Sequence, residues 1–221
     1  HLNKIMQQIS EFKNLHLGKK LFILSSGPSL AELDLSLLKN KIAMGLNRST
    51  LIYPTPYYQC VFDYRLFDLY QEDYKKVRQL FTLEGRPLGL PLKLLGGEGF
   101  SFDLEKGIYS GYTISYFALQ AAVYMGFKKI FFLGLDLKHE GPKTHFFGQD
   151  PQTVNHEQTE FPKMQKMLSF GANTLASSDV EVYNCSPIST LEGFPKISYQ
   201  DALACYPSPF SPPHWTFPST I

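Results

Sequence analysis

The sequence predicts an α/β protein in which a mostly parallel sheet is covered by helices on both faces. Short, nearly continuous apolar runs alternate along the chain with segments of helical periodicity. Strands that are buried on both faces have such runs, and a right-handed crossover places each connecting helix on a face of the sheet. With 221 residues, of which 43% are hydrophobic, the chain can bury one core. We therefore expect a Rossmann-like three-layer sandwich with an irregular insertion.

The first half of the chain supplies the amino-terminal elements of this fold. Residues 1–17 carry apolar side chains at three- and four-residue spacing, which predicts an amphipathic N-terminal helix. The domain proper is expected over residues 18–205. Its first elements are expected in the order strand, short helix, strand, strand and helix, at residues 20–25, 30–38, 42–46, 57–62 and 66–80.

The second half begins with the insertion. Residues 82–106 contain five of the 16 glycines and little periodicity, which predicts an irregular lobe with weak strands. A helix that is apolar nearly all round, a strand, a loop or lid, a helix, a strand and a short helix follow, at residues 113–125, 129–133, 138–160, 161–176, 180–184 and 198–203. Residues 206–221 form a Pro-rich tail.

Composition excludes several functional classes. Lys plus Arg number 21 and Asp plus Glu 20, without a basic block, so we expect no nucleic-acid partner. No apolar run reaches the roughly 18 residues of a membrane span. Cys60, Cys185 and Cys205 have no metal-ligand spacing and are expected to be buried and reduced. These features predict a cytoplasmic protein without a metal site; a peripheral position at the inner membrane and a homo-oligomer remain open.

Candidate site residues follow the apolar runs, because ligands bind beyond the carboxyl ends of strands in an open parallel sheet. Residues 26–30 form a small turning loop that enters a helix, where free amides and the helix dipole favour a phosphate. A tight turn is the alternative. Ser110 and Gly111 open the apolar helix as a second anion site, or Ser110 merely caps it. The expected nucleotide-binding residues are Gly27, Pro28, Ser29, Asn47, Asp63, Ser110, Gly111 and Asp136.

Three of the six histidines lie in the loop before the 161–176 helix: His139, His145 and His156. Their spacings of six and eleven residues match no compact zinc pattern. A histidine titrates near neutrality, so one of them could remove a proton from an attacking hydroxyl, and the alternative is a solvated or structural role. Gly96-Gly97-Glu98-Gly99 lacks the strand-to-helix context of a dinucleotide loop.

The ordered motifs resemble the bacterial Cst-type sialyltransferases, and the framework is similar to the MptE-like superfamily. The resemblance covers residues 20–203. The motifs are Ser26-Gly27-Pro28-Ser29-Leu30, Asn47, Val61-Phe62-Asp63-Tyr64-Arg65-Leu66-Phe67, Ser110-Gly111, Met125-Gly126-Phe127-Lys128-Lys129-Ile130 and Gly134-Leu135-Asp136.

This resemblance implies a nucleotide-sugar-dependent glycosyltransferase of the sialyltransferase type. The donor would be a CMP-sugar and the acceptor a surface glycan, without an obligatory cofactor and with Mg²⁺ left open. His156 would deprotonate the acceptor hydroxyl. Lys138 and His145 stand where the family has two tyrosines that stabilise the leaving phosphate, and Gly107 stands where it has an arginine.

Two alternatives differ in the chemistry they require. An MptE-like diphosphokinase would transfer diphosphate from ATP to a hydroxymethylpterin-like substrate, with an acidic cluster holding Mg²⁺. A non-catalytic, nucleotide-binding partner in glycan assembly would keep the fold without the lost tyrosines and arginine. The first alternative predicts binding of ATP, and the second predicts binding of CMP without turnover.

Overall fold

The computed structural model of the chain describes residues 8–139, 144–150 and 154–205, with the backbone alone for residues 154–158. Its strands are β1 (Lys20–Leu24), β2 (Ala43–Leu46), β3 (Tyr58–Cys60), β4 (Leu80–Leu83), β5 (Leu90–Leu92), β6 (Leu94–Gly96), β7 (Ile108–Tyr109), β8 (Lys129–Leu133) and β9 (Glu181–Asn184). Its α-helices are α1 (Tyr64–Tyr74), α2 (Ile114–Tyr124), α3 (Val154–Leu175) and α4 (Tyr199–Ala204). Four 3-10 helices are η1 (Ile9–Phe12), η2 (Pro28–Glu32), η3 (Leu35–Leu38) and η4 (Asn47–Leu51).

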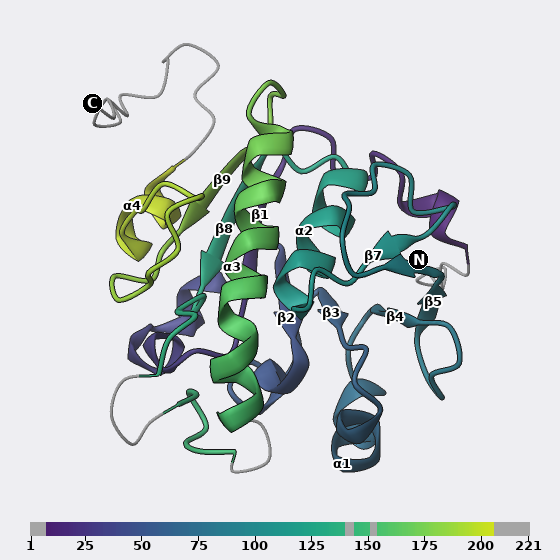
Figure 1. Cartoon of the computed structure of the whole chain (residues 1–221), viewed down its shortest axis with the longest axis horizontal. Coiled ribbons are helices and arrows are strands. Elements are labelled where there is room, and N and C mark those ends of the chain that lie inside the picture. The colour runs from purple at the N-terminus through teal and green to yellow at the C-terminus, as the bar shows by residue number, and fades with distance from the viewer. Residues whose placement is uncertain (1–7, 140–143, 151–153, 206–221) are drawn as a thin grey trace.

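The main sheet has seven strands in the order β5-β4-β3-β2-β1-β8-β9, and every neighbouring pair is parallel. In Figure 1 helices α2 and α3 lie side by side in front of this sheet. Helices η2, η3 and α4 pack on the opposite face. The predicted α/β arrangement with a mostly parallel sheet is therefore confirmed.

Alternation along the central strands divides the core into these two layers. In β1, Leu21 and Ile23 belong to the cluster under α2 and α3, whereas Phe22 and Leu24 belong to the cluster under η2, η3 and α4. All four side chains are at most 2% exposed. Successive side chains of a strand point to opposite faces, so a strand covered on both sides has an uninterrupted apolar sequence.

The N-terminal segment is not the continuous helix expected over residues 1–17. Among the residues described there, only η1 is helical, and turns follow it. Asn14 has a φ of 55°, a left-handed conformation that ends a helix. Its amide and that of His16 donate instead to the carbonyls of Tyr124 and Met125, so the segment closes the C-terminal end of α2.

The 30–38 helix and the insertion also differ from expectation. The former is split into η2 and η3, because Asp34 accepts a hydrogen bond from the Ser36 amide (3.1 Å) and starts a new turn. The segment 82–106 contains the end of β4, the whole of β5 and the whole of β6. β4 and β5 form the edge of the main sheet, whereas β6 pairs with β7 in a separate two-stranded sheet. The predicted 206–221 tail lies outside the described residues.

The structure bears on two further expectations, the burial of the three cysteines and the lack of an apolar segment long enough to span a membrane. Cys60, Cys185 and Cys205 are buried free thiols, as expected. Within the described ranges, no helix combines the length and the apolar character that crossing a bilayer requires.

Acid is expected to destabilise the fold through His16. The side chain is 6% exposed, stacks on Phe127 and lies 2.5 Å from the Tyr58 hydroxyl through its Nε2 atom. Burial, and then the charges of Lys19 and Arg78, lowers the pKa of His16 from 6.5 to about 4. Between these two values only the unfolded chain binds the proton, so stability falls as the pH drops, by about 1–3 kcal/mol in total.

Urea unfolding between pH 7 and pH 4 measures this effect, with His16→Gln as the control that cannot titrate. The variant should lose less stability than the wild type over the same interval. Equal slopes in the two proteins would contradict the assignment to His16.

Candidate functional site

A cavity of about 240 Å³ opens at the point where the strand order reverses. The chain builds the sheet outward from β1 to β5 and then returns to place β8 on the other side of β1. Loops after these two central strands diverge there, which is where open α/β sheets bind ligands. The volume lies near the lower end of the roughly 300–1,000 Å³ that is usual for ligand pockets.

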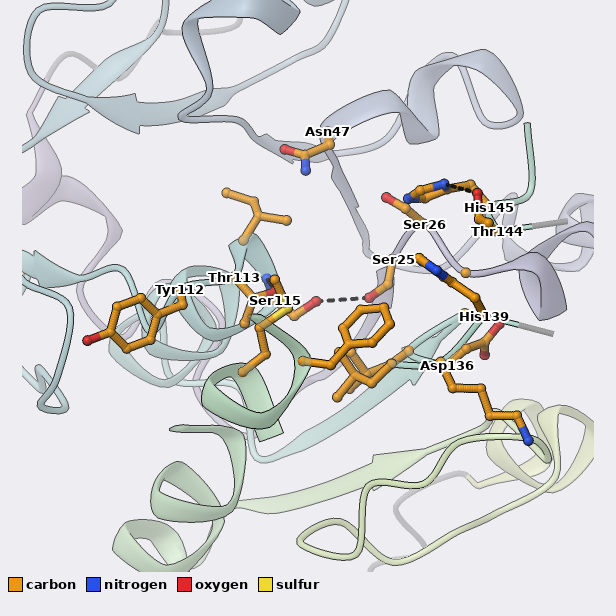
Figure 2. A pocket seen from close by; sticks show the side chains of 18 of the residues that line it. Ser25, Ser26, Asn47, Tyr112, Thr113, Ser115, Asp136, His139, Thr144 and His145 are labelled. Carbon is orange, nitrogen blue, oxygen red and sulfur yellow. Dashed lines mark hydrogen bonds between the residues drawn. The ribbon is translucent and has the colours of Figure 1, made fainter. Parts of the chain in front are cut away.

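Three segments provide most of the walls of this cavity (Figure 2). They are the loop after β1, the N-terminal end of α2 and the loop after β8. The lining residues are Ser25, Ser26, Gly27, Asn47, Phe62, Asp63, Tyr112, Thr113, Ile114, Ser115, Gly134, Leu135, Asp136, Leu137, Lys138, His139, Thr144, His145, Phe161 and Met164.

Asp136 ties the loop after β1 to the loop after β8. Its carboxylate is 2% exposed and accepts hydrogen bonds from the Ser29 amide (2.9 Å), the Ser29 hydroxyl (2.5 Å) and the Ser186 hydroxyl. Because its oxygens are engaged in this way, Asp136 shapes the floor of the cavity. The Ser29 amide, expected to bind a phosphate, is used in the same junction.

Gly27 allows the two loops to approach. Its amide donates to the Gly134 carbonyl (2.9 Å), and a Cβ atom at position 27 would lie 2.3 Å from Asp136 Oδ2 and 2.5 Å from the Gly134 carbonyl oxygen. Real Cβ atoms essentially never come so close, and one of these atoms belongs to the backbone. Only glycine therefore fits, and the sequence-predicted phosphate-binding glycine has a structural role.

Gly27→Ala is expected to lower the free energy of unfolding by about 1–3 kcal/mol, because overpacking forces the two loops apart. Thermal unfolding measures the loss. Gly18→Ala is the matched control, because no atom lies within 4 Å of a Cβ at position 18, although its φ of 77° adds backbone strain. A Gly27→Ala protein as stable as the wild type would contradict the tight junction.

The N-terminal end of α2 forms the second wall. Thr113 caps the helix by accepting from the Ser115 amide (3.3 Å), and the Ser115 hydroxyl lies 3.2 Å from that of Ser25 at the end of β1. Thr113 and Ile114 line the cavity, so the partial positive charge of the helix dipole faces it.

The two sequence-predicted residues ahead of this helix do not line the cavity. The amides of Ser110 and Gly111 donate to the carbonyls of Gly96 and Gly97, both at 2.9 Å, and extend the pairing of β6 with β7. The expected anion site at these amides is therefore corrected: the cavity meets the helix at Thr113 and Ile114 instead. The Gly96-Gly97-Glu98-Gly99 motif has its structural reason here, because a Cβ at Gly97 or Gly99 would clash with the ring of Tyr112 or Tyr109.

Asn47 enters the cavity wall from the end of β2. Its φ is 48°, a conformation that asparagine tolerates better than most residues. Its carbonyl accepts from Gln59 Nε2 (2.9 Å) and the Tyr74 hydroxyl (3.1 Å), which holds the backbone in place. Asp63, in contrast, caps α1 by accepting from the Arg65 amide (3.0 Å), while also lining the cavity.

The segment that follows β8 contributes a lysine and two imidazole side chains to the cavity wall. Lys138, His139 and His145 all contribute, with the two rings centred 6.0 Å apart. An arrangement of this kind favours a negatively charged ligand. His156, the predicted base, lies in the first turns of α3, and its side chain is outside the described part of the chain.

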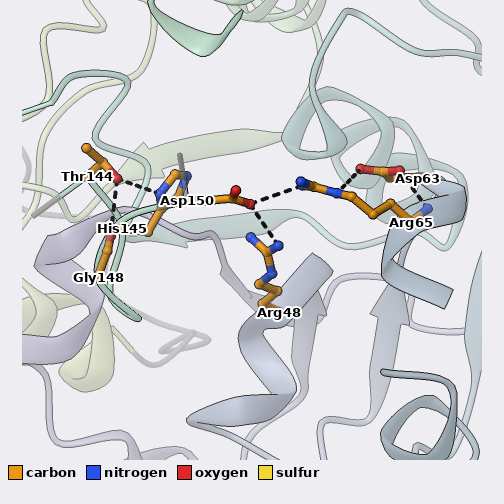
Figure 3. A network of polar contacts seen from close by, with 7 residues as sticks. All are labelled: Arg48, Asp63, Arg65, Thr144, His145, Gly148 and Asp150. Carbon is orange, nitrogen blue, oxygen red and sulfur yellow. Dashed lines mark hydrogen bonds and ion pairs between the residues drawn. The ribbon is translucent and has the colours of Figure 1, made fainter. Parts of the chain in front are cut away.

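A polar network beside the cavity was missed by the sequence-based reasoning (Figure 3). Asp150, which is 8% exposed, forms ion pairs with Arg48 (2.8 Å) and Arg65 (3.1 Å). Arg48 follows β2 and Arg65 begins α1, so the network ties the loop after β8 to two other strand ends. These partners are 85 or more positions apart in the chain, and no local pattern indicates the pairing.

The outcome for the expected site residues is mixed. Six of them line one cavity: Gly27, Asn47, Asp63, Asp136, Lys138 and His145. Four others, Pro28, Ser29, Ser110 and Gly111, are not among its lining residues. Ser115 and Thr144 line the cavity although no sequence pattern singles them out. Among the residues described, no group of three or more His, Cys, Asp or Glu side chains is placed to hold a metal ion.

Three solved structures of glycosyltransferases align with this chain at low sequence identity. The MAf glycosyltransferase from Magnetospirillum magneticum AMB-1 aligns with a TM-score of 0.54 at 15% identity, over 88% of this chain and 38% of that one. The sialyltransferase CstII from Campylobacter jejuni, in complex with cytidine-5'-monophosphate, aligns with a TM-score of 0.49 at 18% identity, over 82% and 86% of the two chains. A second CstII complex, with CMP-3FNeuAc, aligns with a TM-score of 0.46 at 15% identity, over 81% of this chain and 86% of that one.

No family model matches the chain, and no curated protein sequence matches it. At 15% identity the alignment with the MAf glycosyltransferase shows a shared fold, and the chain spans only 38% of that protein's length. The comparison therefore supports the fold alone. Activity and substrate have to be argued from the cavity.

Proposed function

We propose that the chain is a nucleotide-sugar-dependent glycosyltransferase that binds the phosphate end of its donor in the cavity between β1 and β8. The observation that carries this proposal is the position of the cavity at the reversal of strand order, with the start of α2 and Lys138 in its walls. A helix N-terminus and a lysine both favour an anion, and developing negative charge on a leaving phosphate is stabilised by donors of this kind.

A CMP-sugar is the proposed donor, and a surface glycan the proposed acceptor. Support for the cytidine nucleotide comes from the ordered motifs, of which the loop at residues 26–30, Asn47 and residues 134–136 follow β1, β2 and β8. Support for transfer chemistry comes from the imidazoles of His139 and His145 at the same cavity. An imidazole near a bound donor can exchange a proton with an acceptor hydroxyl.

Calorimetric titration with CMP, CDP, UDP, GDP and ATP, with and without Mg²⁺, tests this proposal. Binding of CMP in preference to the other nucleotides is expected. Preference for ATP with Mg²⁺ would instead favour the diphosphokinase. CMP binding without turnover across a panel of glycan acceptors would favour a non-catalytic glycan-assembly protein.

The role of His156 as the base remains a prediction. Comparing His156→Ala with the wild type measures it through the rate of sugar transfer at saturating donor. A large loss of rate with unchanged CMP affinity is expected if this imidazole removes the proton. An unchanged rate would move the base to another side chain of the cavity.

A further inference from the structure

We propose that the edge of the main sheet opposite the cavity docks on the surface of a membrane that contains anionic lipids. The docking surface, which we call the basic edge, consists of residues 13–20, 39–41, 78 and 128–129. It combines two solvent-facing leucines with an excess of positive charge. None of its residues lines the cavity, so the proposal does not depend on the proposed glycosyltransferase activity.

The topology of the sheet brings the segments of the basic edge together. All neighbouring strands of the main sheet are parallel, so their N-terminal ends meet at one edge. Lys20 begins β1 and Lys129 begins β8, and the two residues pair directly in register. Residues 39–41 precede β2. The cavity lies beyond the C-terminal ends of β1 and β8, so the two surfaces are at opposite ends of the sheet (Figure 1).

The loop of residues 13–19 is fixed to the C-terminal end of α2. Three alternate amides of the loop donate to carbonyls there, at 2.8 to 3.0 Å: Asn14 to Tyr124, His16 to Met125 and Gly18 to Gly126. The side chains between these anchored positions face solvent. Leu15 is 42% exposed and Leu17 is 64% exposed, whereas His16 between them is 6% exposed. The backbone therefore holds two leucines outward before any partner arrives.

Positive charge surrounds these leucines. The basic edge contains eight of the 21 Lys and Arg residues of the chain and no Asp or Glu. Its neighbours Asp179 and Glu181 pair with Lys128 (2.6 Å) and Lys129 (3.2 Å). The formal net charge of the whole chain is +1, so the rest of the sequence is net negative. This separation of charge favours an orientation in which the basic edge faces an anionic surface.

Electrostatic effects on two buried or half-buried groups show that these charges lie close together. Burial lowers the pKa of Lys20, and the like charge of Lys41 acts in the same direction. Burial, and then the charges of Lys19 and Arg78, lowers the pKa of His16, the side chain between the two exposed leucines. The loop and the segments beside it therefore form one continuous basic surface.

Leucines among lysines match the boundary between lipid headgroups and acyl chains. Aliphatic side chains leave water there, and lysines meet the anionic headgroups. A rigid loop loses little conformational entropy on docking. A second copy of this chain fits less well, because a two-fold interface would place the same lysines against one another.

Cosedimentation of the whole chain with lipid vesicles tests the proposal. Vesicles of phosphatidylcholine with about 30 mol% phosphatidylglycerol should bind the protein, and vesicles of phosphatidylcholine alone should not. Binding should weaken as the salt concentration rises from about 50 to about 500 mM, because salt screens the charges. No binding to the anionic vesicles, or equal binding to both kinds, would overturn the proposal.

Two double variants test the surface itself. Leu15→Ser with Leu17→Ser should weaken binding to the anionic vesicles about tenfold or more, and Lys13→Gln with Lys19→Gln about 10- to 30-fold. All four side chains are exposed, and thermal unfolding checks that the variants keep their fold. Either double variant binding as the wild type does would overturn the proposal.

Matched controls and two other partners complete the test. Leu69→Ser, at a leucine that is 58% exposed on α1, and Lys76→Gln with Lys166→Gln, at exposed lysines outside the basic edge, should leave vesicle binding unchanged. An equal loss in these controls would overturn the assignment to the basic edge. Binding to poly-glutamate without binding to vesicles would assign the surface to an acidic protein. A dimer that the leucine variant dissociates would assign it to a second copy, and either outcome would overturn the proposal.

Discussion

Asp136→Ala is expected to lower the free energy of unfolding by about 3–5 kcal/mol, because three hydrogen bonds to a buried carboxylate are lost at once. The half-buried amide and hydroxyl of Ser29 and the buried hydroxyl of Ser186 would lose the charged acceptor that they share. For a chain of this length, such a loss corresponds to a fall in Tm of about 6–20 °C. Thermal and urea unfolding both measure it.

Two variants separate the contributions within this junction. Ser186→Ala removes one donor and leaves the carboxylate with both bonds to Ser29, so it should cost about 1–3 kcal/mol. Asp136→Asn keeps the shape of the side chain and loses the charge, and its stability should lie between that of Asp136→Ala and that of the wild type. An Asp136→Ala protein with wild-type stability would show that the carboxylate does not hold the loops together.

Lys138→Ala is expected to reduce kcat by about 10²- to 10³-fold, equivalent to about 2.7–4 kcal/mol, if its ammonium group stabilises the leaving phosphate. Lys138 lines the cavity directly after Asp136 and Leu137, and Leu137 has a φ of 50° that turns the backbone out of the strand direction. The charge acts mainly when negative charge develops, so kcat should fall more than CMP affinity. Steady-state kinetics with a CMP-sugar measure both quantities.

Lys138→Arg and Lys39→Ala are the controls for this prediction. The first keeps the charge and should retain a larger part of the rate, and the second removes an exposed lysine that is not among the lining residues. A rate of donor hydrolysis that is unaffected by Lys138→Ala would contradict the assignment. Equal losses in Lys138→Ala and Lys39→Ala would indicate a general effect of charge.

Local signals in the sequence were sufficient for the strands and several helix starts. The uninterrupted apolar run of residues 20–24 gave β1, because a strand covered by layers on both faces buries every side chain. The short helix expected over residues 198–203 matches α4, where the Ser198 hydroxyl accepts from the Asp201 amide (3.0 Å). These features depend on neighbouring residues alone and can therefore be seen in a sequence.

Features that depend on distant partners were the ones missed. The splitting of the 30–38 segment had a local signal in Asp34, whereas the closure of α2 by the chain near Asn14 had none. The amides of Ser29 and Ser110 lie at turns, as expected. They already donate hydrogen bonds within the protein, to the Asp136 carboxylate and the Gly96 carbonyl respectively. Spacing can place a donor at the end of a strand, and it cannot show that another loop already uses it.

The central claim is that the cavity between β1 and β8 holds the phosphate of a cytidine nucleotide. A crystal structure of the protein with CMP tests it most directly. The account predicts that the phosphate lies within the cavity, between the start of α2 and Lys138. A CMP molecule bound elsewhere on the protein, or a cavity that stays closed to CMP at saturating concentration, would contradict it.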